Sequence, residues 1–210
     1  LVHDAAATSK AISGKTSGSW GYRVRACNVG GCSAYSSIAS VAVTLPPTGV
    51  PTLSGPSTGM NGSYTISWTS VSVATRYELQ ERLGSGSWAQ IHNAAATSRA
   101  ISGKANGSWS YRVRACNTGG CAGWSSTHAV QVLNKPASAP TLTVPATNTT
   151  GGYTIGWNSV ATSTRYELEE RLGSGSWVQI HNAAGTSRAV SGKTTGSWNY
   201  RVRACNDAGC

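Results

Sequence analysis

The chain has 210 residues, a formal net charge of +10, 25 glycines and no phenylalanine. Charged residues make up only 11% of the chain, while tryptophan and tyrosine number eight each, so the composition excludes an intrinsically disordered chain. No apolar run approaches the roughly 18 residues of a membrane span, and we expect no membrane-spanning segment. Low charge together with many serine, threonine, glycine and β-branched residues favours an all-β protein.

The sequence repeats itself at a constant offset of 89 residues. The motif that begins at His92 occurs again at His181 and, slightly changed, at His3. No insertion or deletion interrupts this register, even in the connecting segments. Proline-bearing stretches at 45–51 and 134–140 mark the boundaries between repeats and predict semi-rigid spacers.

We divide the chain into three units on this basis. Residues 1–46 are the C-terminal half of a unit, residues 47–135 form a complete unit, and residues 136–210 form a unit that lacks its last strand. Broken units would leave apolar sheet faces bare, and we expect any export signal to lie outside this segment. We therefore expect a window from a longer array, or completion of the broken units by neighbouring molecules.

Within the complete unit, apolar and polar residues alternate with a period of two, which predicts β-strands. The predicted strands lie near 52–53, 64–68, 76–80, 88–91, 100–101, 111–116 and 130–132. About seven short strands separated by glycine-rich turns are typical of a two-sheet β-sandwich. No segment leaves room for a helix.

The order of several residues in the complete unit resembles a fibronectin type III domain. These residues are Pro51, Trp68, Tyr77, Tyr111 and Ser125, together with the repeated pattern around them. The likeness is to the divergent bacterial kind that occurs in tandem in secreted and surface proteins. It covers essentially the whole chain and implies tandem immunoglobulin-like β-sandwiches, with Trp68 in the core.

The resemblance also implies a role for the tyrosine that opens the sixth strand. In that family this tyrosine forms a corner hydrogen bond back to the backbone, and Tyr22, Tyr111 and Tyr200 match it. One departure is Lys104, which stands where the family usually has leucine just before the corner. We expect Trp109, two residues before the tyrosine, to supply the missing apolar volume.

The six cysteines form three local pairs, and each pair brackets four turn-forming residues. The pairs are Cys27 with Cys32, Cys116 with Cys121, and Cys205 with Cys210. This spacing predicts three disulfides, each closing a hairpin, with Cys116 turned away from the core. Two thiolates per unit are only half of a tetrahedral zinc site, so a metal knuckle is the weaker alternative. Paired cysteines indicate an oxidising compartment and hence secretion or the cell surface.

The sequence offers little that could support catalysis. Copies of a residue lie one unit apart, roughly 35 Å for strands of this length, so they cannot converge on one site. The complete unit contains only two acidic residues, Glu78 and Glu81, and no nucleophile motif, metal-ligand cluster or phosphate loop. We predict no enzymatic activity, no cofactor and no metal.

The third and sixth strands carry charges that we expect to face each other. Glu78 and Gln80 are expected on the same outer face as Arg112 and Arg114, where they form a solvated charge ladder. The alternative is a polyanion-binding surface, in which the two arginines stack on Trp124 as cation–π pairs. That arrangement is similar to the tryptophan–arginine ladder of cytokine-receptor fibronectin domains.

Two further tryptophans, Trp88 and Trp177, follow a Gly-Ser-Gly-Ser turn. They are candidates for exposed aromatic platforms that bind sugar rings. The interpretation we favour is that they cap the edge of the sandwich beside Ile91 and Ile180.

These observations predict a non-enzymatic structural array of a long secreted or surface bacterial protein, acting as a spacer, stalk or fibre-forming segment. The expected partners are neighbouring repeats or copies of the chain itself, because identical head-to-tail contacts generate a rod or filament. The alternative function is adhesion to carbohydrate or another polyanion through surface arginine and tryptophan. No nucleic-acid-binding motif is present, and no specific nucleic-acid partner is expected.

Overall fold

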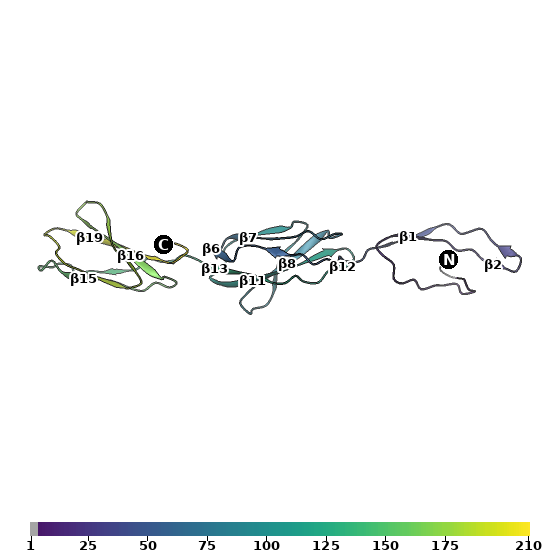
Figure 1. The fold of residues 1–210 in the computed structure, drawn as a ribbon, viewed down its shortest axis with the longest axis horizontal. Helices are drawn as coiled ribbons and strands as arrows, with labels where there is room; N and C mark the ends of the chain where they lie inside the picture. Colours follow the sequence, from purple (N-terminus) through teal and green to yellow (C-terminus); the bar gives the residue numbers. More distant parts are fainter. Residues whose placement is uncertain (1–3) are drawn as a thin grey trace.

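The computed structural model describes residues 4–210 and shows three β-rich units arranged end to end (Figure 1). His3 and the other two residues at the start of the 1–46 segment lie outside the described residues. Residues 4–210 contain no helix, and therefore none long and apolar enough to cross a membrane. The predicted all-β fold class is confirmed.

The second unit is a sandwich of two sheets. The smaller sheet has the order β10 (Ser98–Ile101), β7 (Tyr64–Trp68) and β5 (Leu53–Ser54). The larger sheet has the order β6 (Thr58–Met60), β13 (His128–Leu133), β11 (Gly107–Asn117), β8 (Arg76–Leu83) and β9 (Ala89–Ala94), with the short β12 (Gly120–Cys121) beside β11. Two opposed, mainly antiparallel sheets with these connections form a fibronectin type III-like sandwich.

The core of the second unit is made by the inward-facing residues of both sheets. Ile66 from one sheet and Leu79, Tyr111 and Val113 from the other are fully buried. Trp68 is 5% exposed and packs against the same cluster, as its match to the family's core tryptophan implies. Alternation along each strand thus places the apolar residues between the sheets and the polar ones outside.

The third unit repeats this plan with its own core. Its sheets have the orders β14 (Leu142–Thr143), β15 (Tyr153–Trp157), β18 (Ser187–Val190), and β17 (Val178–Ala183), β16 (Arg165–Leu172), β19 (Trp198–Cys205). Ile155 and Leu168 are its fully buried apolar residues. In the first unit, β1 (Gly18–Tyr22) pairs with β4 (Ala39–Val43), and β2 (Cys27–Asn28) pairs with β3 (Gly31–Cys32).

Strand β6 was not expected from the sequence. It runs parallel to β13, with Thr58 opposite Gln131, and so extends the larger sheet by one strand. Only three residues long and containing Gly59, it has too little alternation to be recognised. Gly59 is required there, because a Cβ atom would lie 2.4 Å from the Tyr64 ring.

Cys116 lies outside the core cluster, as predicted, but it is fully buried because its disulfide partner Cys121 on β12 and the side chain of Glu78 cover it. The prediction for the corner tyrosine is wrong. The Tyr111 hydroxyl pairs with the Tyr64 hydroxyl at 2.8 Å rather than with the backbone. The hydroxyls of Tyr200 and Tyr153 pair in the same way at 2.6 Å.

Candidate functional site

Three hairpin disulfides are present, as the cysteine spacing predicts. Cys116 and Cys121 lie directly opposite each other on β11 and β12, so the bond closes the hairpin across its two strands. The equivalent bonds join the other two pairs, one in each flanking unit. The hairpins differ in burial, because Cys27 is exposed in the first unit whereas Cys116 and Cys205 are fully buried.

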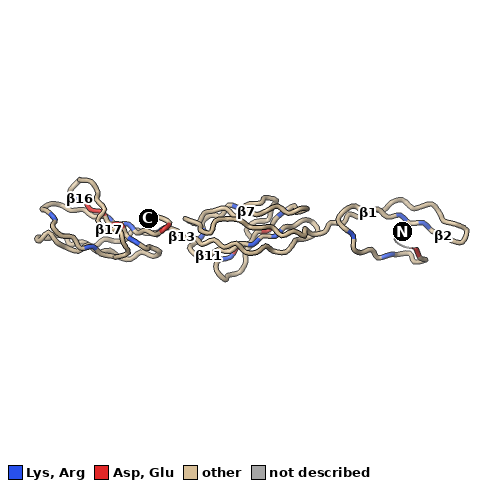
Figure 2. The backbone as a smooth tube through the Cα atoms, in the orientation of Figure 1, with Lys and Arg blue, Asp and Glu red and all other residues tan. Residues whose placement is uncertain are grey.

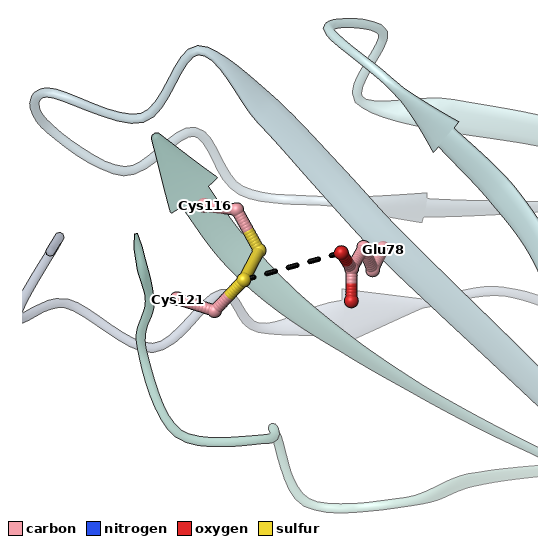
Figure 3. A group of neighbouring side chains, drawn as sticks. All are labelled: Glu78, Cys116 and Cys121. Atoms are coloured by element: carbon pink, nitrogen blue, oxygen red, sulfur yellow. Dashed lines mark hydrogen bonds between the residues drawn. A yellow bond between two sulfur atoms is a disulfide. The ribbon is translucent and has the colours of Figure 1, made fainter. Parts of the chain in front are cut away.

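Glu78 lies against this disulfide (Figure 3), with its Oε1 atom 4.0 Å from Cys121 Sγ. Its carboxylate also pairs with Arg114 at 2.7 Å and with Arg76 at 3.6 Å. Glu78 is therefore only 8% exposed, which corrects the expectation of a solvated ladder at this position. The arginines and the disulfide together cover the carboxylate.

Glu78, Cys116 and Cys121 bring three metal-ligating residue types together, and Glu167, Cys205 and Cys210 do so in the third unit. These donor sets do not suit a metal ion. Each pair of sulfurs is bonded within a disulfide and offers no thiolate. The carboxylate of Glu78 is already neutralised by two arginines. The group is better explained as the packing of a closed hairpin.

Removing the disulfide from the second unit, by the double substitution Cys116→Ser and Cys121→Ser, should lower its free energy of unfolding by about 2 kcal/mol. The reason is the freedom that the small loop gains in the unfolded chain. Denaturant unfolding monitored by tryptophan fluorescence measures the change. The matched variant Cys27→Ser with Cys32→Ser alters an exposed hairpin and should leave the second unit unchanged. Equal effects of the two double variants would contradict this assignment.

Arginine and tryptophan side chains alternate in a row on the outer face of the larger sheet. The row consists of Arg82, Trp88, Arg112, Trp124 and Arg114, and each guanidinium carbon lies 4.3–4.5 Å from the centre of a neighbouring indole ring. We call this set the Arg–Trp row. Four of the five predicted surface residues belong to it, the exception being Trp177 in the third unit, and Arg82 is a member that the sequence did not predict.

The guanidinium groups of Arg82 and Arg112 lie over the Trp88 ring, an arrangement that the sequence did not predict for this residue. Trp177 is placed in the same way by Arg171 and Arg201. These indoles are half-buried, so neither is an open platform for a sugar ring.

The middle arginine of the row, Arg112, faces an uncharged side chain on β8 rather than a carboxylate. Gln80 accepts two hydrogen bonds from Arg112, at 2.9 and 2.7 Å from its Nε and Nη2 atoms. Burial, followed by the nearby charges of Arg82 and Arg114, lowers the pKa of Arg112 from its ordinary value. Three cations are therefore held close together with an uncharged amide between them.

A second cluster surrounds Lys104, which lies in the turn between β10 and β11. Lys104 pairs with Glu81, which is 7% exposed, beside the hydroxyls of Tyr64 and Tyr111. The ammonium group also lies 4.3 Å from the centre of the Trp109 ring, which packs against the core. Burial, and then the hydrogen bond with Tyr64, raises the pKa of Tyr111. The third unit repeats the pair as Lys193 and Glu170, with Nζ–Oε1 at 2.6 Å.

The junctions between units are held by hydrogen bonds from both sides. The Leu45 N–H donates to Ser17 Oγ of the first unit at 3.0 Å, and its carbonyl accepts from Asn117 Nδ2 of the second unit at 2.9 Å. At the next junction, the Asn134 N–H donates to Asn106 Oδ1 at 2.7 Å, and its carbonyl accepts from Asn206 Nδ2 at 2.9 Å. At each of the two junctions, one linker residue is therefore hydrogen-bonded to the unit before it and to the unit after it.

The hairpin closed by the disulfide brings Asn117 to the linker. The same amide donates to the Val73 carbonyl at 3.2 Å, and Asn117 Oδ1 accepts from the Gly119 N–H at 2.8 Å. A Cβ atom at Gly119 would lie 2.2 Å from the Thr44 carbonyl oxygen, so the linker and hairpin backbones are in close contact. The corresponding residue of the third unit is Ala208, so the two junctions share the asparagine contact but differ at this point.

No protein-family model matches the sequence, and the search of curated proteins finds no match either. Among solved structures, the chain is similar to the FN1–FN3 domains of chicken contactin (CNTN1), with 18% sequence identity and a TM-score of 0.39. That match covers 90% of this chain and 73% of the other.

Proposed function

We propose that this chain is a non-enzymatic structural segment that holds successive β-sandwiches at fixed separation and orientation, as a spacer or stalk of an extracellular bacterial protein. The observation that carries the proposal is the repeated junction, in which a linker residue is hydrogen-bonded to the unit before it and to the unit after it. A floppy tether needs no such bonds, whereas a spacer that transmits orientation does.

Three features support an extracellular place for this segment. The cysteines are paired in disulfides, which persist in oxidising compartments. The two sandwiches have small cores, for which a covalent staple is a common supplement. Basic residues occur in all three units (Figure 2), and the net charge of +10 favours solubility of an exposed segment.

The proposed partners are further repeats, or copies of the chain placed end to end. A junction whose contacts recur at a constant offset generates a regular rod when it is repeated. The function of such a rod is to extend or display what it carries. Electron microscopy of longer arrays should then show axial repeats at one constant spacing.

Asn206→Ala should loosen the second junction. Loss of its amide removes the bonds to the Asn134 and Thr162 carbonyls, and leaves the Ala208 N–H without its acceptor. The distance distribution between spin labels on the second and third units should widen by at least twofold, while the denaturation midpoint of the second unit stays unchanged.

The matched control is Asn28→Ala. Asn28 is the equivalent residue of the first unit, where it is exposed and accepts the Gly30 N–H at 2.8 Å within its own hairpin. That variant should leave the spin-label distances unchanged. A wild-type distribution already as broad as that of the Asn206 variant would reject the role of a rigid spacer.

A further inference from the structure

We propose that the Arg–Trp row of the second unit is a binding site for an acidic polysaccharide. The row presents the guanidinium groups of Arg82, Arg112 and Arg114 in sequence along one face, each separated from the next by an indole ring. No more than about 9 Å separates consecutive guanidinium carbons, since each lies within 4.5 Å of the ring centre between them. A line of fixed cations of this kind suits a linear polyanion.

The local balance of charge is what makes this face attractive to an anion. On the outer face of β8 and β11 of the second unit, Arg76, Arg82, Arg112 and Arg114 are accompanied by one carboxylate, that of Glu78. The other carboxylate of β8, Glu81, is buried and pairs with Lys104. The Glu78 carboxylate is occupied by Arg114 and Arg76 at one end of the row. Arg112 and Arg82 therefore remain without a carboxylate partner among the ion pairs of the described residues.

The third unit supplies a natural contrast at one position. Glu169 stands there in place of Gln80, and its Oε2 atom pairs with Arg201 Nε at 2.5 Å. The equivalent arginine is thereby neutralised in the third unit, whereas Gln80 leaves Arg112 charged and only hydrogen-bonded in the second. The same backbone thus carries a more cationic row in one unit than in the other.

The arrangement of the rings decides which class of polyanion fits. Single-stranded nucleic acids are held by bases that stack on open aromatic faces. Here each indole is half-buried and has two guanidinium groups over it, which leaves little ring surface for stacking. A ligand that is bound only through its negatively charged groups fits this surface better. The disulfides indicate an extracellular location, where acidic polysaccharides occur.

The test uses the whole oxidised chain and three immobilised probes: heparin, polygalacturonate and neutral dextran. The wild-type chain should bind both acidic polysaccharides, with an affinity that falls steeply as salt is raised. Gln80→Glu copies the pairing seen in the third unit, so it should fold normally and weaken binding by about fivefold while lowering the salt slope. Glu169→Gln makes the opposite change and should strengthen binding by a similar factor.

Several outcomes would overturn the proposal. Equal retention on dextran, or affinities unchanged by both substitutions, would show that the row is not the site. A single-stranded oligonucleotide that binds more tightly than either polysaccharide, with the same dependence on Gln80, would replace the ligand class with nucleic acid. The spacer role is tested by the junction variants and does not depend on any of these results.

Discussion

Lys104→Met is expected to destabilise the second unit by about 3–5 kcal/mol. Lys104 is the ion-pair partner of Glu81, and the side chains are 17% and 10% exposed. Methionine keeps most of the apolar stem against Trp109 but leaves the Glu81 carboxylate buried without a counter-charge. The change is measured by urea unfolding of the whole chain, following the transition that the second unit contributes.

Two companion variants separate this cause from simple loss of packing. Adding Glu81→Gln to Lys104→Met removes the uncompensated charge and should recover more than half of the lost stability. Lys15→Met changes the equivalent lysine of the first unit, which lies 4.0 Å from the centre of the Trp20 ring, and should cost under about 1 kcal/mol. A double variant as unstable as Lys104→Met would show that the ion pair is not the reason.

The strands and their faces could be predicted from the sequence because apolar and polar residues alternate along a strand whose two faces point to the core and to solvent. Tyr111 and Val113 point inward and Arg112 and Arg114 outward, and the pairing of Arg112 with Gln80 and of Arg114 with Glu78 follows from the expected adjacency of β8 and β11. The disulfides were predictable for a similar reason, since a hairpin fixes which residues lie opposite each other.

The clusters that join distant segments could not be predicted in the same way. Lys104 and Glu81 lie on different segments of the fold, and a lysine beside a glycine looks like an ordinary surface residue. The sequence Cys-Asn-Thr-Gly-Gly predicts that Asn117 is an ordinary turn residue, but its side-chain amide donates a hydrogen bond to the Leu45 carbonyl of the linker. Repetition at 89 residues was the available signal, because both features recur in the third unit.

Distance along the sequence also explains why the predicted backbone hydrogen bond of Tyr111 is wrong. The family pattern supplies a tyrosine that bonds to the backbone, but here Tyr64 on β7 places a second hydroxyl beside Tyr111. The two rings meet edge to face, with centroids 6.1 Å apart. A neighbouring hydroxyl at this distance satisfies Tyr111, and sequence order alone gives no sign that the two residues meet.

Raising the pH above about 10 should unfold the second unit with an unusually steep dependence. Burial raises the pKa of both Tyr64 and Tyr111, so both stay protonated in the folded unit while unfolded tyrosines lose their protons near pH 10. The stability they contribute is therefore fully present below pH 10 and is lost as the pH rises toward the folded-state values. Each shifted tyrosine should remove about 1.4 kcal/mol per pH unit over that range.

Urea midpoints measured at intervals above pH 9, together with phenolate absorbance, test this expectation. The buried tyrosines should ionise only as the unit unfolds, so the absorbance change and the loss of tryptophan signal should coincide. The double variant Tyr64→Phe with Tyr111→Phe retains the rings and removes both hydroxyls. Its stability should be lower at pH 8 but should fall less steeply above pH 10, because the two protons that link folding to pH are gone. A slope equal to that of the wild-type chain would place the alkaline sensitivity elsewhere, in lysine and arginine titration.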